Sequence, residues 1–168
     1  MKAPGKLLEP LKPENLHAQY EMVRLMAGIS ADLGRAYASW LGHMAMHPVT
    51  PLKGGAGFAA DCLDISHEVL LRLAGNEVAP RKPTNGDRRF KSEAWEKRVP
   101  FMVLRRGYEA YAAAVLRMVE ETPGVAEETR DKVRFHTAQF LDALAPANFL
   151  LTNPEALGHG VKSRGKSV

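Results

Sequence analysis

The distribution of apolar residues along the chain predicts helices throughout. From Glu14 onward, mostly apolar side chains recur at spacings of three and four, which is the period of one face of an α-helix. The series comprises Leu16, Tyr20, Val23, Ala27, Ser30, Leu33, Tyr37, Trp40 and Met44, with Leu41 beside Trp40. Pro13 suits the first turn and Pro48 ends the run, so this helix has about 30 residues and is about 45 Å long.

The same period predicts three further helices. They run from about Phe58 to Leu73, from Val99 to about Glu121, and from about Glu127 to Leu144. Residues 48–57 and 77–86, rich in proline and glycine, are expected to form a loop and a linker. The side chains expected to face inward are Phe58, Cys62, Ile65, Val69, Leu73, Phe101, Leu104, Tyr108, Tyr111, Val115, Met118, Val133, His136, Phe140 and Leu144. Because no period-two run is convincing, the chain is predicted to be all-α, with four main helices and a C-terminal helical hairpin.

The region after residue 144 combines proline, an apolar run and a capping signal. Phe149, Leu150 and Leu151 are expected to lie tucked against the preceding helices, since a surface loop has no reason to carry such a run. Asn153 is expected to cap a new helical turn that begins at Pro154. Upstream, Ser92 is expected to cap a short turn that leads to Trp95.

The pattern divides the chain into five expected parts. Residues 1–13 form a flexible arm and 14–76 a leading helical segment, joined by the linker 77–86 to a helical core at 87–157. Residues 158–168 form a basic tail expected to be disordered.

The long first stripe needs a partner, because large apolar side chains left together in water form an association site. It packs either on the chain's own helices or on another surface, and the sequence leaves both open. The residues assigned to an interaction surface are Leu16, Tyr20, Val23, Leu33, Tyr37, Trp40, Leu41 and Met44. Those assigned to anchoring the domain are Phe90, Trp95, Phe149, Leu150, Leu151 and Asn153.

Composition narrows the class of protein. The 168 residues are 45% hydrophobic and 25% charged, which is typical of a globular domain. One cysteine excludes an internal disulfide framework and suits a reducing cytoplasm, and no apolar window is long enough to predict a membrane span. The net charge of +4 either favours anionic partners or serves solubility.

Residues with chemical potential occur singly. Cys62 and His67 are five apart, which places them about 140° apart around a helix, so Cys62 is interpreted as a small core residue. His43 and His47 have the spacing of a shared metal site but lack a third ligand, so no metal site is predicted, and His136 is interpreted as a core histidine. Asp87-Arg-Arg-Phe-Lys91 suits binding of phosphate or nucleic acid, because arginine forks onto phosphate oxygens. Lys53-Gly-Gly-Ala-Gly57 lacks the features of a phosphate loop.

Three ordered motifs carry a resemblance to a known family. They are Asp87-Arg-Arg-Phe90 followed by Trp95, then Lys132-Val-Arg-Phe-His-Thr-Ala-Gln-Phe-Leu-Asp-Ala-Leu144, then Pro146-Ala-Asn-Phe-Leu-Leu-Thr-Asn-Pro-Glu155. Together they resemble the N-terminal region of class I-like poly(3-hydroxyalkanoate) synthases, which make storage polyester from hydroxyacyl-coenzyme A. The resemblance is close over residues 87–157 and looser over 14–76. It implies that Arg88 and Arg89 pair with acidic residues within the domain. It also implies that Phe90 and Trp95 anchor the linker in the core.

The resemblance implies a cysteine, histidine and aspartate in a following α/β-hydrolase domain, none of which can be carried onto this sequence. We therefore expect a non-catalytic region, with no cofactor, that acts in the cytoplasm and on storage granules. Its implied partners are a second copy, a full-length synthase or catalytic domain, and the granule surface or granule proteins. Alternatives are acyltransferase activity, as family membership read literally implies, and a small basic nucleic-acid binder, which lacks a recognisable recognition helix.

Overall fold

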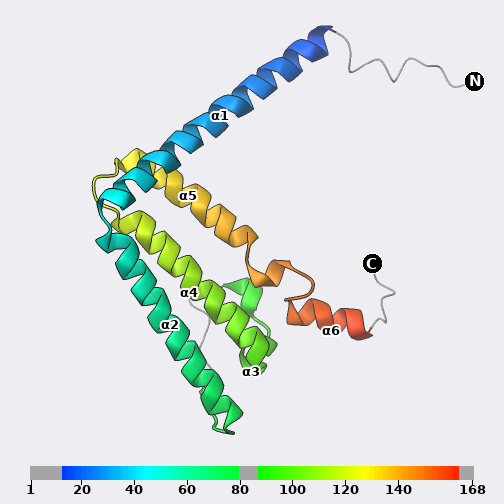
Figure 1. Ribbon diagram of the computed structural model, residues 1–168. Coiled ribbons are helices and arrows are strands. Elements are labelled where there is room, and N and C mark those ends of the chain that lie inside the picture. Colours follow the sequence, from blue (N-terminus) through cyan, green and yellow to red (C-terminus); the bar gives the residue numbers. More distant parts are fainter. Residues whose placement is uncertain (1–12, 80–86, 163–168) are drawn as a thin grey trace, which may run out of the picture.

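The computed structural model describes residues 13–79 and 87–162, and the regular structure within these ranges is entirely helical (Figure 1). The elements are α1 (Pro13–Met46), α2 (Val49–Leu73), the 3-10 turn η4 (Arg88–Phe90), α3 (Ala94–Lys97), α4 (Val99–Glu121), α5 (Glu127–Ala143), the 3-10 turn η5 (Pro146–Asn148) and α6 (Pro154–Lys162). These ranges contain no strand. The prediction of an all-α chain with four main helices is confirmed.

Helices α2, α4 and α5 form the body of the molecule. In Figure 1, α2 and α4 lie side by side and run in opposite directions, and α5 returns antiparallel to α4. The α4–α5 hairpin turns at Thr122-Pro123-Gly124, where Gly124 has a φ of +77°. Helix α1 crosses the end of this body over α5 and then projects away from it (Figure 1). Only the last part of α1 therefore belongs to the packed body.

A hydrophobic cluster fills the junction of α1 with the α4–α5 hairpin. Its buried members are Ala36, Trp40, Val119, Val125 and Val133, with Tyr37, Met44 and Met118 packed against them. Arg130 closes the turn beside this cluster, because its Nη2 donates to the Thr122 carbonyl over 3.0 Å. The hairpin turn and the end of α1 thus share one core.

A second cluster pins the segment before α4 to the end of α5. Phe90 and Trp95 are 3% and 1% exposed, and their ring centroids lie 4.9 Å apart in an edge-to-face arrangement. Phe101 and Tyr108 of α4 and Ala145 complete the cluster. Trp95 lies in α3, whose first turn is supported by Ser92, since Ser92 Oγ accepts from the Ala94 amide over 3.4 Å. This turn at Ser92 was predicted.

Ion pairs join α4 to α2 and to α3. Glu68, only 4% exposed, accepts from Arg72 Nη2 over 2.6 Å and also pairs with Arg106 of α4. Arg105, 1% exposed, pairs with Glu96 of α3. Each charge that folding removes from water here has an opposite charge against it, which is the condition for burying ionised groups.

The predicted loop at 48–57 is wrong, because α2 begins at Val49. Pro51 lies in the first turn of α2, where the backbone amide needs no helical partner, so proline is tolerated. Gly54 is buried against α4, and a Cβ atom there would lie 2.6 Å from Met118 Cγ. This glycine therefore allows two helices to approach closely and does not break one. The predicted end of α2 is confirmed at Gly75, which has a φ of +83°.

Several predicted inward faces are shifted. On α4 the buried side chains are Met102, Arg105, Ala114 and Val119, whereas the predicted Leu104 and Tyr111 are exposed. On α5 they are Val133, Thr137 and Leu141, whereas Phe140 and Leu144 are exposed. On α2, Leu73 is exposed. The apolar pattern misplaces these faces because charged and small residues, such as Arg105 and Ala114, take buried positions beside the apolar residues that were predicted to face inward.

The predictions for the two ends and the linker can be compared with the structure only where it describes these residues. Helix α6 continues to Lys162, so the expected disorder of 158–168 is wrong for its first five residues. The remainder of that tail, the arm at 1–12 and most of the linker, 80–86, lie outside the described residues.

Gly54 and Gly55 give a matched test of the α2–α4 packing. Gly54→Leu is expected to lower the free energy of unfolding by roughly 1–3 kcal/mol, because the new side chain collides with Met118. Gly55→Ala is expected to raise it by about 0.5–1 kcal/mol, because its Cβ meets nothing within 4 Å and alanine favours the helix. Urea unfolding followed by circular dichroism measures both. Equal effects of the two substitutions would contradict the close α2–α4 contact.

Candidate interaction surface

The C-terminal half of α1 is fixed to the body by polar contacts of three of its side chains. Trp40 Nε1 donates to Thr122 Oγ1 over 3.1 Å within the buried core. The Tyr37 hydroxyl lies 2.7 Å from Thr137 Oγ1, and Lys132 Nζ donates to Asp32 Oδ2 over 2.5 Å. The contacts reach both α5 and the end of α4. They determine where α1 leaves the body.

The ion pair between Asp32 and Lys132 is the last of these contacts toward the N-terminus of α1. The hydrogen bond from Lys132 lowers the pKa of the Asp32 carboxyl, and the same bond raises the pKa of Lys132. Both groups are therefore held in their charged forms at neutral pH. The pair marks the point beyond which α1 has no neighbour in the described body.

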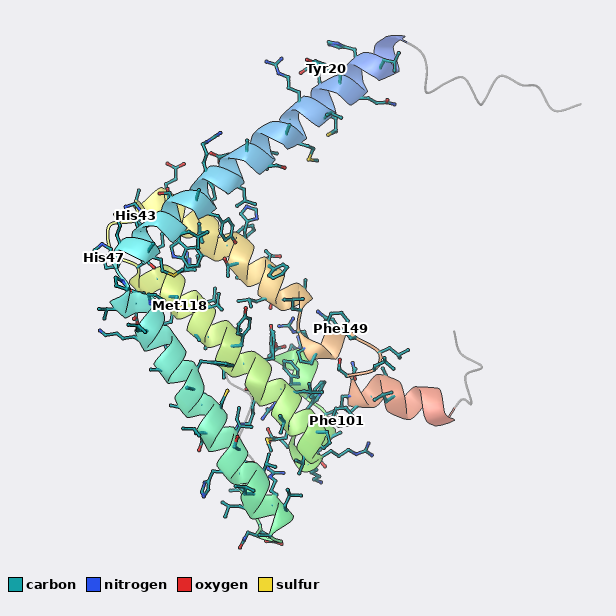
Figure 2. The ribbon with its side chains drawn as sticks, viewed as in Figure 1. Tyr20, His43, His47, Phe101, Met118 and Phe149 are labelled. Carbon is teal, nitrogen blue, oxygen red and sulfur yellow. The ribbon has the colours of Figure 1, made fainter. Side chains whose placement is uncertain are left out.

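Beyond Asp32, every described side chain of α1 is exposed from residue 16 to residue 31. The large apolar ones are Leu16, Tyr20, Met22, Val23, Leu25, Met26 and Ile29, which are 49–66% exposed. Tyr20 marks this projecting part in Figure 2, far from His43 and Met118 at the junction. We refer to residues 16–31 as the free half of α1.

The predicted interaction stripe is thus divided between two environments. Leu16, Tyr20 and Val23 are exposed on the free half, and Leu41 is 49% exposed further along. Trp40 is buried in the core, and Leu33, Tyr37 and Met44 are partly buried beside it. Packing on the chain's own helices therefore applies to the C-terminal half of α1. The free half stays available to another surface.

Sequence reasoning missed four exposed apolar residues of the free half: Met22, Leu25, Met26 and Ile29. A usable signal was present. Met22, Met26 and Ile29 continue, at spacings of four and three, into the partly buried Leu33 and then into Ala36 and Trp40, which pack in the core. Leu25 lies beside them. The apolar face that is buried at one end of α1 therefore continues along the free half without cover.

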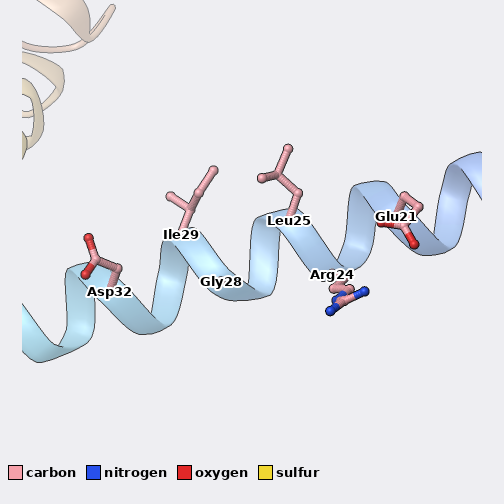
Figure 3. A pocket seen from close by; sticks show the side chains of 6 residues that line it. All are labelled: Glu21, Arg24, Leu25, Gly28, Ile29 and Asp32. Carbon is pink, nitrogen blue, oxygen red and sulfur yellow. The ribbon is translucent and has the colours of Figure 1, made fainter.

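A shallow hollow lies on this part of α1. It is lined by Glu21, Arg24, Leu25, Gly28, Ile29 and Asp32. Figure 3 shows that all six belong to the one helix, with Leu25 and Ile29 on the same side and Gly28 between them. With a single helix forming it, the hollow is a feature of a contact surface and does not enclose a small molecule.

The apolar run after α5 is exposed, which corrects the prediction that it is tucked in. Phe149, Leu150 and Leu151 are 48%, 63% and 80% exposed, because the turn after η5 directs them outward (Figure 2 labels Phe149). Pro154 is buried instead. Asn153 caps α6 as predicted, since its Oδ1 accepts from the Glu155 amide over 2.9 Å.

The predicted pairing of the Asp87 segment holds for one of its two arginines. Arg89 Nη2 donates to Asp87 Oδ2 over 2.7 Å and to Asp142 Oδ1 over 2.8 Å, which ties η4 to the end of α5. The hydrogen bonds from Arg89 lower the pKa of Asp87, and those to Asp87 raise the pKa of Arg89. Burial raises the pKa of Tyr108, whose hydroxyl donates to the Leu141 carbonyl over 3.1 Å. Arg88 is exposed.

The other residues with chemical potential lie apart from one another. Cys62 is a partly buried free thiol within α2, and His67 is exposed. His43 Nδ1 lies 2.8 Å from the Ser39 carbonyl and its ring packs against Gly124, while His47 is exposed. His136 is partly buried beside Phe135. Among the described residues no group of three or more acidic, histidine or cysteine side chains is placed to hold a metal ion.

Two further observations on the described residues concern a membrane span and a phosphate loop. None of its helices is long and apolar enough to cross a membrane. Residues 53–57, weighed above as a phosphate loop, lie inside α2.

Comparison with known proteins places this helical architecture in a family. Residues 86–168 match the family model described as poly-beta-hydroxybutyrate polymerase (PhaC) N-terminus. The poly(3-hydroxyalkanoate) polymerase of Methylorubrum extorquens is 28% identical over 167 residues, which is 96% of this chain. The poly(3-hydroxyalkanoate) polymerase subunits PhaC of Rhizobium meliloti and Cupriavidus necator are 34% identical over 122 residues (72% of this chain) and 38% identical over 82 residues (49%). Residues 86–168 therefore form a domain of this polymerase N-terminus family.

The relatives are much longer proteins. The chain covers 27% of the Methylorubrum polymerase, 20% of the Rhizobium subunit and 14% of the Cupriavidus subunit. No solved structure matches the chain.

The division of α1 into two halves predicts contrasting costs of truncating its aromatic residues. Trp40→Ala is expected to lower the free energy of unfolding by about 3–5 kcal/mol, because it empties a core site and removes the N–H that donates to Thr122. Tyr20→Ala is expected to change it by no more than about 0.5 kcal/mol, because Tyr20 is 63% exposed. Chemical unfolding measures both, and a large loss for Tyr20→Ala would place the free half against the body.

The Asp87–Arg89 pair predicts a pH-dependent contribution to stability. Because folding lowers the pKa of Asp87, its carboxylate stabilises the fold above the unfolded pKa of about 3.9, and this contribution is lost as the pH falls through the lowered folded value. Asp87→Asn keeps a side-chain acceptor for the Arg89 amide but removes the charge. At pH 7 it is expected to cost up to about 1 kcal/mol, since both partners are partly exposed.

Urea unfolding of both proteins between about pH 7 and pH 2 tests this expectation, with the exposed Asp61→Asn as the control. The difference between parent and Asp87→Asn should shrink as the pH falls. A difference that grows toward low pH would mean that the Asp87 charge does not stabilise the fold.

Proposed function

We propose that this chain acts in storage-polyester synthesis as a non-catalytic region of a poly(3-hydroxyalkanoate) polymerase. In this role it attaches to the polyester granule or its proteins, associates with itself, and supports the catalytic part of the enzyme. Its partners are then the polymer surface, a second copy, and a full-length polymerase or its catalytic domain. Family membership and the names of the relatives support the link to polyester synthesis.

The observation that carries the proposed attachment is the free half of α1. Leu16, Tyr20 and Val23 lie within about 60° of one another around the helix, at 100° per residue, and are 49–66% exposed. A helix with an apolar arc of this kind lies readily on a hydrophobic surface. We assign Leu16, Tyr20 and Val23 as the attachment face.

The chemistry of a polyester suits this face. Its alkyl side groups present apolar surface to Leu16 and Val23, and its ester carbonyl oxygens accept hydrogen bonds. The Tyr20 hydroxyl can donate such a bond while its ring contacts the alkyl groups, as tyrosine does at boundaries between apolar and wet regions. The polar residues His17, Glu21 and Arg24 lie on a separate arc of the helix, centred about 100° from the attachment face, and stay in water.

The proposed chain contributes no nucleophile of its own to polymer synthesis. Cys62, its one cysteine, lies inside α2 about 140° around the helix from His67, so that histidine is not placed to take the thiol proton that thioester attack requires to be removed. Acyltransferase activity, if this chain takes part in it, then depends on residues supplied by another part of a polymerase.

Co-sedimentation of the full chain with protein-free polyhydroxybutyrate particles tests the attachment face. Val23→Lys is expected to weaken binding about tenfold, because it exchanges a buried apolar side chain for a charge at the polymer surface. His17→Lys adds a positive charge on the polar arc of the same free half of α1 and is the matched control, expected to bind like the parent. Substitution is preferable to deletion of α1, because deletion also removes Trp40 from the core.

Two outcomes decide the proposal. Equal binding of Val23→Lys and His17→Lys would exclude the attachment face. Binding to native granules but not to protein-free particles would assign the contact to a granule protein and not to the polyester.

A further inference from the structure

The outer side of α2 carries an apolar face of its own. Helix α2 lies at the edge of the body and packs on α4 (Figure 1). On its other side, six residues lie along about 32 Å of helix, within an arc of about 100°. They are Leu52, Ala56, Ala59, Leu63, Leu70 and Leu73, and all six are exposed. We refer to these residues as the α2 seam.

The seam is distinct from the face that packs on the body. Gly54 and Ile65, which are buried, lie about 150° around α2 from the centre of the seam. Ser66 stands between Leu63 and Leu70, and its hydroxyl donates to the Cys62 carbonyl over 2.8 Å. Because this bond satisfies the hydroxyl within the helix, Ser66 does not interrupt the apolar surface.

The area of the seam is that of a contact surface. Its four leucines are 65–74% exposed, which is high for side chains of this size. Together with the two alanines they offer on the order of 600 Å², about three quarters of the roughly 800 Å² that each partner buries in a standard-size interface. Contiguous apolar surface of this extent marks an interaction site.

The spacing of the seam suits a helix as the partner. Its residues follow one another at four and three when Ser66 is included, so the seven-residue repeat holds for three heptads. Such a repeat moves around a straight helix by only about 20° per heptad, which keeps the seam against a second helix along its length. The small side chains of Ala56 and Ala59 leave room for the partner's backbone to approach. A polymer surface has no period that would require this pattern.

One border of the seam is positively charged. Lys53 lies along it, and Arg117 of α4 stands beside it, since a Cβ atom on Gly57, one turn after Lys53, would lie 3.4 Å from Arg117 Nη1. Both cations are exposed. The carboxylate of α2 nearest to this border, Asp64, is already paired with Arg106 of α4. The border therefore suits acidic side chains of a partner.

We propose that the α2 seam docks an amphipathic helix of another protein. The apolar side of that helix packs on the leucines, and its acidic residues lie against Lys53 and Arg117. A second copy of the chain fits less well, because the other border of the seam, at Gly55, Cys62 and Val69, is uncharged. The cationic border of one copy would therefore meet no acidic border on the other.

This inference goes beyond the attachment to polyester proposed above and does not rest on it. The seam lies on α2, whereas the attachment face lies on the free half of α1. Docking is therefore measured in solution without polyester.

Two helix-stapled synthetic peptides serve as probes. Both carry leucine and alanine at alternating spacings of four and three, and the positions that border this series are glutamate in one peptide and lysine in the other. Fluorescence anisotropy of the labelled peptides measures their binding to the full chain. The glutamate peptide is expected to bind at low salt, and the lysine peptide at least tenfold more weakly.

Leu63→Lys is expected to weaken binding of the glutamate peptide at least tenfold, because it places a charge in the middle of the seam. Val23→Lys adds the same charge at an exposed apolar site of α1 and is the matched control, expected to bind like the parent. Both side chains are more than 60% exposed and lysine is a good helix former, so both variants should retain the parent's circular dichroism spectrum.

Arg117→Glu gives a second, independent measurement. It reverses one charge at the border, so it should weaken binding of the glutamate peptide and strengthen binding of the lysine peptide. Loss of folding cannot produce opposite changes for the two peptides.

Four results would overturn the proposal. The first is a glutamate peptide that does not bind, or that binds Leu63→Lys as well as the parent. The second is equal binding of the two peptides. The third is self-association in ultracentrifugation that Leu63→Lys abolishes, which would assign the seam to a second copy. The fourth is weaker co-sedimentation of Leu63→Lys with protein-free polyester particles, which would assign it to the polymer. The effect of Val23→Lys on polyester binding is separate from the first three.

Discussion

The rest of the structure depends on the buried contact between Trp40 and Thr122. The indole ring fills the junction of α1 with the α4–α5 hairpin, and its N–H finds a hydroxyl that itself donates to the Met118 carbonyl over 2.5 Å. Trp40 therefore links α1 to the last turn of α4, and Met118 links that turn to Gly54 of α2. Three helices meet through this chain of contacts, and the direction of the projecting helix is a consequence of it.

The extents of the helices could be predicted because their signals are local. Thr122-Pro123-Gly124 ends one helix and Asn153-Pro154 begins another whatever the rest of the chain does. The faces could not be predicted as well, because the buried positions include Arg105 and Glu68, whose burial depends on partners brought by other helices. The glycine-rich start of α2 was misinterpreted for a related reason. A glycine needed for close packing and a glycine that breaks a helix look alike in a sequence.

Only part of the candidate interaction surface could be predicted from the sequence. Apolar spacing alone selected Leu16, Tyr20 and Val23 on α1, but the same spacing joined them to Trp40, which has a different role. The division falls at Asp32, and it is visible only once Lys132, a hundred residues later, is known to stand opposite. Met22, Leu25, Met26 and Ile29 were overlooked because a single stripe was traced where the helix carries two. The family resemblance rested on the motifs of residues 87–155, so it was informative about class while saying little about α1.

Helix α1 acts mechanically as a lever whose fulcrum is the Trp40 junction. Leu16 lies 24 residues before Trp40, which is about 36 Å along the helix axis. A tilt of about 10° at the junction displaces that end by about 6 Å, roughly the width of one side chain. Small changes of packing around Val119, Val125 and Val133 are thereby magnified at the distant tip. The packing of the small core around Trp40 therefore determines how precisely the apolar residues at the far end of α1 are positioned.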